Sequence, residues 1–201
     1  MTKWNKKVFA GNTYDKYSTR NPIFRFLVSS YKQQFQRLIM PLNVSSILEV
    51  GCGEGYIVEF LKRITPVKIN AFDLDARVVL DAKVKCPNSN FLVADACHLP
   101  YKSNSFNLVL ACEVLEHIRF PDDFLQEVAR VTNQYCLIGV PNEPLWRIIN
   151  FMRGAYVRDL GNTPGHVNHW NSRSLVKLLN VYFEVIEIRS PLPWLMVLCK
   201  K

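Results

Sequence analysis

A short apolar run that ends in a glycine-rich turn constrains the fold of this chain more than any other feature. Residues 47–55 read Ile-Leu-Glu-Val-Gly-Cys-Gly-Glu-Gly, and a helical pattern follows them. The alternating glycines allow positive φ angles and a close approach of the backbone to a bulky ligand. The first N–H groups of the following helix have no partner within that helix. The segment therefore predicts a strand, a nucleotide-binding turn and a helix.

The spacing of the glycines narrows the class of nucleotide. A dinucleotide fingerprint, G-x-G-x-x-G, requires glycine at the position that Tyr56 occupies. A phosphate-binding P-loop requires Gly-Lys-Ser/Thr after four spacer residues, and no lysine lies between Gly51 and Phe60. The turn thus suits neither a pyrophosphate nor a triphosphate, and a nicotinamide oxidoreductase is disfavoured.

The pattern E-x-G-x-G-x-G, from Glu49 to Gly55, resembles motif I of the class I S-adenosylmethionine-dependent methyltransferases. The resemblance implies S-adenosylmethionine as the cofactor and S-adenosylhomocysteine as the product. It also implies that the turn backbone holds the methionine moiety and that Glu49 orders the turn. The turn residues concerned are Gly51, Cys52, Gly53 and Gly55.

Two acids farther along the chain extend the resemblance. Asp73 stands 22 positions after Gly51, where a carboxylate accepts hydrogen bonds from ribose hydroxyls in nucleotide-binding folds. The segment Asp95-Ala96-Cys97-His98-Leu99-Pro100 resembles the family's D-A-x-x-L-P stretch. The resemblance implies that Asp95 and Ala96 meet the adenine edge.

Two later segments complete the set of motifs. Ser105–Val109 and Glu113–Ile118 resemble the family's S-F-D-x-V and E-x-L-E-H segments, with Asn107 in place of the usual aspartate. Together the motifs span roughly residues 47–142 and are closest to the small-molecule branch called type 11. The resemblance implies four further cofactor contacts, two near the methionine amine and two beside the adenosine: Cys112 and Glu113, and Leu74 and Tyr56.

Strands that alternate with helical stretches predict an α/β fold with a parallel sheet. We expect strands near residues 47–50, 67–73, 91–94, 105–112 and 135–140, and a closing hairpin at 183–188 and 194–199. Helices are expected at residues 23–40, 56–64, 75–85, 121–131 and 172–180. The resemblance implies a Rossmann-like, mostly parallel sheet of seven strands with helices on both faces and an antiparallel C-terminal hairpin strand.

We expect a single domain over residues 1–201, a length that supports a full hydrophobic core. Within it, residues 1–45 would form lead-in and lid helices, and residues 46–141 the cofactor-binding core. Residues 142–170 would form a substrate-side insertion, and residues 171–201 the C-terminal helix and hairpin. Tyr14 and Tyr17 are candidates for the lid.

The net charge of +8 is unevenly distributed. Residues 1–37 carry eight basic and one acidic residue, a net charge of +7, and residues 145–201 carry eight and three, a net charge of +5. Residues 38–144 carry nine basic and thirteen acidic residues, a net charge of −4. Basic segments on both sides of an acidic core favour an anionic or membrane-associated substrate, although solvated basic faces explain the same pattern.

The substrate-side insertion begins with a segment that fits an amphipathic helix. Trp146, Ile148, Ile149 and Met152 fall near one face of it, with arginines beside them. A helix packed on the sheet edge is the favoured interpretation. The alternative is an apolar, basic-rimmed cap for a lipid-linked acceptor, or a surface that contacts a membrane peripherally.

Histidine is the side chain best suited to remove a proton from an acceptor near neutral pH. Four are present, and two of them lie in a loop similar to the family's substrate-side loop: His166 and His169. His166 is the first candidate for the catalytic base and His169 the second. A zinc site built on this pair lacks the third ligand that zinc requires, so no metal site is predicted, and a structural role for one imidazole is equally consistent.

Composition excludes several other classes of protein. No apolar run reaches the roughly 18 residues that span a bilayer, and residues 1–7 lack the apolar core of a signal peptide. The six cysteines form no C-x-x-C pair, so they indicate reduced, mostly buried thiols rather than a zinc knuckle. We therefore expect a cytoplasmic protein.

The sequence as a whole predicts an S-adenosylmethionine-dependent methyltransferase that acts on a small-molecule acceptor, anionic or linked to a lipid or glycan. An RNA or protein methyltransferase is one alternative. A nucleic-acid partner is disfavoured, because Ala111-Cys112-Glu113-Val114 lacks the N/D-P-P-Y/F motif typical of enzymes that methylate the amino groups of bases. A cofactor-binding scaffold without catalysis is the other alternative.

Overall fold

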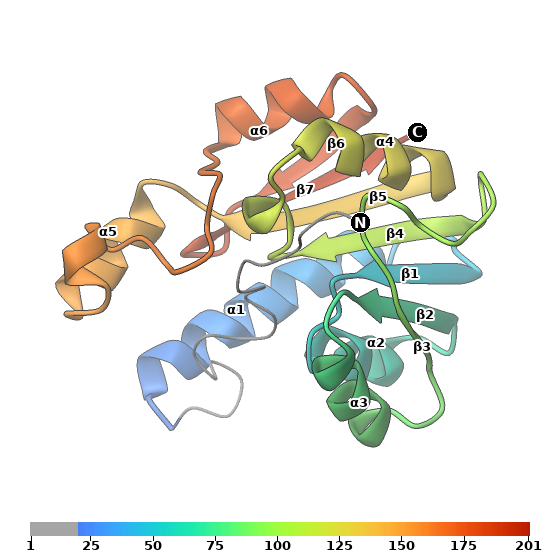
Figure 1. Ribbon diagram of the computed structural model, residues 1–201, viewed down its shortest axis with the longest axis horizontal. Coiled ribbons are helices and arrows are strands. Elements are labelled where there is room, and N and C mark those ends of the chain that lie inside the picture. Colours follow the sequence, from blue (N-terminus) through green and yellow to red (C-terminus); the bar gives the residue numbers. More distant parts are fainter. Residues whose placement is uncertain (1–19) are drawn as a thin grey trace, which may run out of the picture.

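The computed structural model describes residues 20–201, which form one seven-stranded sheet with helices on both faces (Figure 1). The strand order is β3-β2-β1-β4-β5-β7-β6. The first five strands are parallel, and β7 runs antiparallel to both β5 and β6. The strands are β1 (Ser46–Val50), β2 (Lys68–Asp73), β3 (Asn90–Val93), β4 (Phe106–Cys112), β5 (Thr132–Pro141), β6 (Glu184–Arg189) and β7 (Trp194–Lys200). The predicted sheet and its closing hairpin are confirmed.

Six α-helices are present in this part of the chain, and those predicted begin and end within one residue of the expected positions. They are α1 (Pro22–Ile39), α2 (Tyr56–Ile64), α3 (Ala76–Lys85), α4 (Pro121–Val131), α5 (Leu145–Met152) and α6 (Ser172–Leu179). Two 3₁₀ turns, η1 (Leu115–His117) and η2 (Val157–Asp159), lie in the connections. None of the helices in residues 20–201 combines the length and apolarity needed to cross a bilayer.

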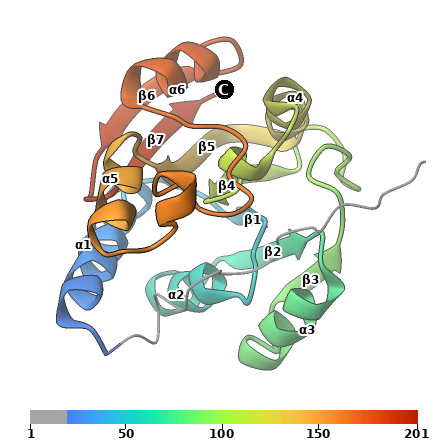
Figure 2. The same cartoon turned by 60° about the vertical axis from the view of Figure 1, so that its left-hand side comes forward.

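The sheet separates two hydrophobic cores. Helices α1, α2 and α3 cover one face, where Ile47 and Leu110 point, and α4 and α6 cover the other, where Leu48 and Val109 point (Figures 1 and 2). Successive residues of a strand point to opposite faces, so strands covered on both sides are apolar at nearly every position. This two-sided burial explains the continuous apolar runs in the sequence.

Local capping determines where several helices begin. The Asn21 side chain accepts a hydrogen bond from the Ile23 amide at 2.9 Å, and Pro22 occupies the first turn of α1. Asn171 and Ser174 form a reciprocal capping box at the start of α6. The helix that follows the glycine-rich turn begins at Gly55 instead, which adopts a left-handed conformation.

Helix α5 packs on the sheet edge only in part. Trp146 packs against the core and against Trp194 of β7. Ile148 and Met152 of the same expected face are 49% and 80% exposed, whereas Asn150 is buried. The Asn150 amide donates to the Gly161 carbonyl at 3.0 Å and to Thr163 Oγ1 at 3.2 Å. These bonds hold α5 against the loop that follows it, and the helix lies beyond the ends of the strands (Figure 1).

The three glycines of the turn each have a positive φ, but for different local reasons. A Cβ on Gly51 would lie 2.5 Å from Val114 Cγ2, and one on Gly55 would lie 3.0 Å from the Cβ of Ala82 on α3. A Cβ on Gly53 would meet no atom of residues 20–201 within 4 Å. Gly51 and Gly55 are thus required for packing, whereas Gly53 faces open space.

We predict that Gly55→Ala lowers the free energy of unfolding by about 2 to 4 kcal/mol, because it combines left-handed strain with a clash against α3. Gly53→Ala incurs the strain alone, about 1 to 2 kcal/mol. Urea denaturation of the ligand-free protein measures both losses. Equal losses in the two variants would show that the contact between Gly55 and α3 adds nothing to the cost of a Cβ at position 55.

Candidate cofactor and acceptor site

The predicted site residues gather at one edge of the sheet. The glycine-rich turn follows β1, Asp73 ends β2, Asp95 follows β3, and Glu113 follows β4. These four strands are neighbours in the order β3-β2-β1-β4, and the direction of strand addition reverses between β1 and β4. In open α/β sheets ligands bind at such a reversal, beyond the carboxyl ends of the strands.

Asp73 ties the turn to the end of β2. Its Oδ2 accepts a hydrogen bond from the Gly53 amide at 2.9 Å, and its Oδ1 accepts one from the Asp75 amide at 3.1 Å. The neighbouring Cys52 amide donates to the Phe72 carbonyl at 2.9 Å. Because a carboxylate has about four acceptor positions, Asp73 orders the turn and retains positions for a ligand hydroxyl.

Glu49 lies beneath this turn and is 2% exposed. Its Oε2 has no hydrogen-bond partner among residues 20–201. Burial, and then the negative charge of Asp73, raise the pKa of Glu49 well above its ordinary value. Burial also raises the pKa of the adjacent Cys52 thiol, with Glu49 and Asp73 contributing. The floor of the turn therefore favours the neutral, protonated forms of Glu49 and Cys52 beside the charged Asp73.

The residues expected around the adenosine are more exposed. Asp95 Oδ1 accepts a hydrogen bond from the Cys97 amide at 2.9 Å, and the Asp95 side chain is 41% exposed. Ala96 is half-buried and Leu74 is exposed. The ring of Tyr56 lies under the ammonium group of Lys85, 3.0 Å from the ring centroid. These side chains lie on either side of Asp73 along the strand ends.

The end of β4 holds Glu113 in an unusual conformation. Its φ of 60° is in the left-handed region, and its amide donates to the Gly139 carbonyl at 2.7 Å. Its Oε1 accepts a hydrogen bond from Trp194 Nε1 at 2.8 Å. A left-handed non-glycine residue costs of order 1 kcal/mol or more and persists where its surroundings impose it. Cys112, just before it, is half-buried.

His166 lies in a cluster that the sequence does not predict. It is 9% exposed and packs edge-on against His117, with ring centroids 4.9 Å apart. The buried carboxylate of Glu116 completes the cluster, and the metal-ligating atoms of the three residues lie within 4.8 Å of one another. Glu116 and His117 are adjacent in the sequence, but no sequence signal connects them to a histidine in a distant loop.

His169 lies outside this cluster. Its Nε2 is 2.9 Å from the Asn162 side-chain oxygen. Burial, and then the charge of Arg147, lower the pKa of His169 and favour the neutral imidazole. The structure therefore separates the two histidines that the sequence offered as alternatives. Tyr14 and Tyr17, the lid candidates, lie outside the described residues.

Comparisons with known proteins agree with this arrangement. A family model described as "Methyltransferase domain" matches residues 48–137. A "Probable S-adenosylmethionine-dependent methyltransferase" of Mycobacterium tuberculosis is 29% identical over 147 residues, which are 72% of this chain and 50% of that protein. Residues 48–137 thus resemble a methyltransferase domain, and the chain is similar to S-adenosylmethionine-dependent methyltransferases. It spans about half the length of this curated relative.

Solved structures share the fold of this chain. A protein from Pyrococcus horikoshii superimposes with a TM-score of 0.72 at 13% identity, covering 94% of this chain and 96% of that one. The magnesium protoporphyrin IX methyltransferase from Synechocystis, with bound SAH, gives a TM-score of 0.68 at 14% identity, covering 91% of this chain and 89% of that one. At these identities the likeness establishes the fold alone.

One departure of this sequence from the methyltransferase motifs has a structural explanation. Asn107 replaces the usual aspartate at the start of β4. Its side-chain oxygen accepts hydrogen bonds from the Ser45 amide at 3.1 Å and from the hydroxyls of Ser45 and Ser46 at 2.7 and 3.1 Å. An amide oxygen satisfies these donors as a carboxylate would, so the substitution preserves the start of the strand pair.

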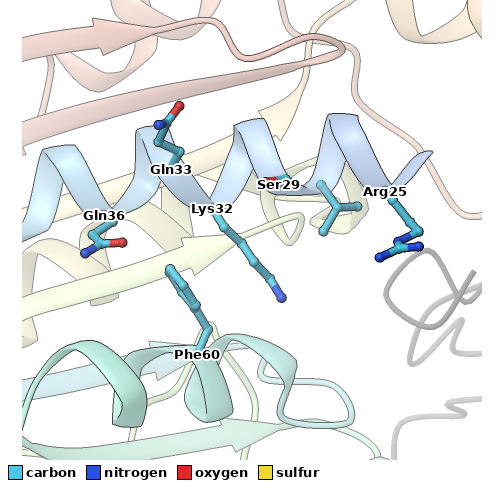
Figure 3. A pocket seen from close by; sticks show the side chains of 7 residues that line it. Arg25, Ser29, Lys32, Gln33, Gln36 and Phe60 are labelled. Carbon is cyan, nitrogen blue, oxygen red and sulfur yellow. The ribbon is translucent and has the colours of Figure 1, made fainter. Parts of the chain in front are cut away.

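A hollow of about 420 Å³ lies between α1 and α2, away from the predicted site residues (Figure 3). Lys32 and Phe60 face each other across it, with the ammonium nitrogen 5.6 Å from the ring centroid. Burial, and then the charge of Arg63, lower the pKa of Lys32. The hollow contains none of the residues that the methyltransferase motifs identify.

We predict that Glu49→Gln reduces the loss of stability at high pH. The raised pKa of Glu49 means that the folded protein retains a proton that the unfolded chain releases, so stability falls as pH rises above the ordinary glutamate pKa. The variant should match the wild type near pH 5 and exceed it by about 1 to 3 kcal/mol near pH 8. Urea denaturation at both pH values measures the difference. The exposed Glu184→Gln serves as control, and an unchanged pH slope in Glu49→Gln would contradict this assignment.

Proposed function

We propose that this protein transfers a methyl group from S-adenosylmethionine to a small-molecule acceptor by in-line displacement, within a single domain. The observation that carries the proposal is the convergence of the glycine-rich turn, Asp73, Asp95 and Glu113 on the carboxyl ends of four adjacent strands. The similarity of residues 48–137 to a methyltransferase domain supports the same activity. A scaffold that binds the cofactor without catalysis is the alternative.

Each part of the cofactor has a chemically suitable partner. The free acceptor positions of Asp73 suit the ribose hydroxyls, and Asp95 with Ala96 suits the adenine edge. The Gly51–Gly55 backbone suits the methionine moiety. Cys112 and Glu113 at the end of β4 suit the methionine amine. The sulfonium and ammonium groups of the cofactor are cationic, which favours a site with the negative charges of Asp73 and Glu113 nearby.

On the acceptor side, alignment supplies most of the rate enhancement, because the sulfonium is already an activated leaving group. A base is required only when the acceptor must lose a proton. His166 remains the first candidate for this role, since it lies in the loop beside η1 with a carboxylate close by. His169, whose ring nitrogen is engaged by Asn162, remains the second.

The surface of α5 and η2 supports an apolar or lipid-linked acceptor with an anionic group. Five apolar side chains are between 48% and 80% exposed there: Ile148, Phe151, Met152, Val157 and Leu160. Arg153 and Arg158 lie among them in sequence. Arg153 is stacked over the Phe24 ring, 5.2 Å from its centroid, so the surface borders the start of α1 (Figure 2). We call these five residues the α5 surface.

We predict micromolar binding of S-adenosylmethionine and of its demethylated product, and no binding of NAD. Asp73→Ala should weaken the affinity about a hundredfold, because it removes charge-assisted hydrogen bonds worth about 3 kcal/mol. Isothermal titration calorimetry measures these affinities, with the exposed Asp81→Ala on α3 as control. Absence of binding would reject the proposal, and binding without turnover over a broad acceptor panel would favour the scaffold.

We predict that the α5 surface contacts anionic lipid. The wild type should co-sediment with phosphatidylglycerol vesicles at low salt and less at high salt, since ion pairing is screened. Exchange of Phe151 and Met152 for serine should weaken this binding at least about tenfold. Val84→Ser on α3, where Val84 is 85% exposed, is the matched control. Equal co-sedimentation of all three proteins would rule out the α5 surface.

A further inference from the structure

We propose that Glu116, His117 and His166 bind one divalent transition-metal ion, with zinc the best match. Two imidazole nitrogens and one carboxylate oxygen are a ligand set found in catalytic zinc sites, which leave another coordination position open. The proposal goes beyond methyl transfer and concerns residues to which the family motifs assign no metal.

The ligand atoms are close enough for a single ion. They lie within 4.8 Å of one another, and a tetrahedral zinc ion with ligands at 2.0 to 2.1 Å separates them by about 3.3 Å. A bound ion would therefore draw the three ligand atoms closer together than they lie in the metal-free cluster.

The tautomer of His117 is already suited to metal binding. Its Nδ1 lies 3.0 Å from the Gly165 carbonyl oxygen. A carbonyl only accepts, so Nδ1 carries the proton and the neutral ring presents its lone pair at Nε2. Metal-ligating histidines characteristically donate their other N–H to a backbone carbonyl or carboxylate, which orients the ring. The partner here belongs to the residue immediately before His166.

Backbone hydrogen bonds hold the two segments together before any ion binds. The Glu116 carbonyl accepts from the amides of Val167 and Asn168, at 2.9 and 3.1 Å. The Asn168 side chain donates to the Ile118 carbonyl at 2.6 Å. Since η1 and the loop are joined on both sides of the cluster, the ligands lose little conformational entropy on binding an ion. Preorganisation of this kind favours high affinity.

The surroundings distinguish this cluster from an exposed group of polar side chains. Glu116 is 2% exposed and His166 is 9% exposed, whereas His117 is half-buried. Trp146 stacks on the outer side of His166, with ring centroids 6.5 Å apart. The Glu116 carboxylate is therefore shielded from bulk water, and access is retained on the His117 side.

The position also suggests a use for the ion. The cluster follows β4, beside Glu113, at the edge where an acceptor would meet the methyl donor. A metal with an open position binds an acceptor oxygen and lowers the pKa of a hydroxyl. The ion would then replace His166 as the group that activates the acceptor, because a ligated imidazole has no free lone pair to accept a proton. This use rests on the proposed methyl transfer, whereas metal binding itself does not.

The test is calorimetric titration of the full chain, freed of metal with a chelator, with zinc chloride and no S-adenosylmethionine. We expect one ion per chain and a higher melting temperature with zinc. Glu116→Gln and His166→Gln, which preserve side-chain size, should each weaken zinc binding about a hundredfold or more. His98→Gln, an exposed histidine outside the cluster, should bind like the wild type.

The six cysteines require a second measurement, because thiolates also bind zinc. The cobalt(II) form of the wild type should show ligand-field bands without a sulfur-to-cobalt charge-transfer band. That spectrum decides the question even if the variants do not fold. Absence of binding, unchanged affinity in folded Glu116→Gln and His166→Gln, or a thiolate band would overturn the site. Zinc binding without S-adenosylmethionine binding would leave the metal site standing and reject the proposed function.

Discussion

The hydrogen bond between the Gly53 amide and the Asp73 carboxylate is the interaction on which the rest of the site depends. It joins the turn after β1 to the end of β2, at 2.9 Å. The turn can reach that carboxylate only because its three glycines adopt positive φ angles, and Gly55 then lies against Ala82 of α3. The Asp73 carboxylate thus joins the end of β2 to the turn after β1, and this turn in turn sets the positions of α2 and α3. The same carboxylate retains acceptor positions for a ligand.

This arrangement carries an electrostatic cost that a cationic ligand would relieve. Glu49 lies buried below Asp73, and burial together with that neighbouring charge raises its pKa. In the absence of a ligand the pair is a source of instability, since a buried carboxyl group without a partner is unfavourable. A sulfonium and an ammonium near these acids would stabilise their charged forms. Binding sites commonly sacrifice stability for function in this manner.

The sequence was most informative where each residue's role depends on near neighbours. The strands of the core are apolar on both faces and alternate with helical patterns, so most elements could be predicted to within one residue, although β5 begins three residues before its expected position. The packing of α5 could not, because it depends on hydrogen bonds between Asn150 and a loop whose path no periodicity reveals. The cluster around His166 was missed for a related reason: the Glu116 carbonyl, a backbone atom without a sequence signature, brings that loop to η1.

Contacts between aromatic side chains connect α5 to His166 and to the end of β4. Trp146 of α5 stacks on His166 and packs against Trp194, with ring centroids 5.7 Å apart. Trp194 in turn donates its indole N–H to Glu113 at the end of β4. Because Trp146 is also fixed by a 2.9 Å hydrogen bond to Thr163, a displacement of α5 cannot leave these partners unchanged. Trp146 therefore links α5 to His166 directly and to Glu113 through Trp194, so the position of this helix is tied to the geometry of two predicted site residues.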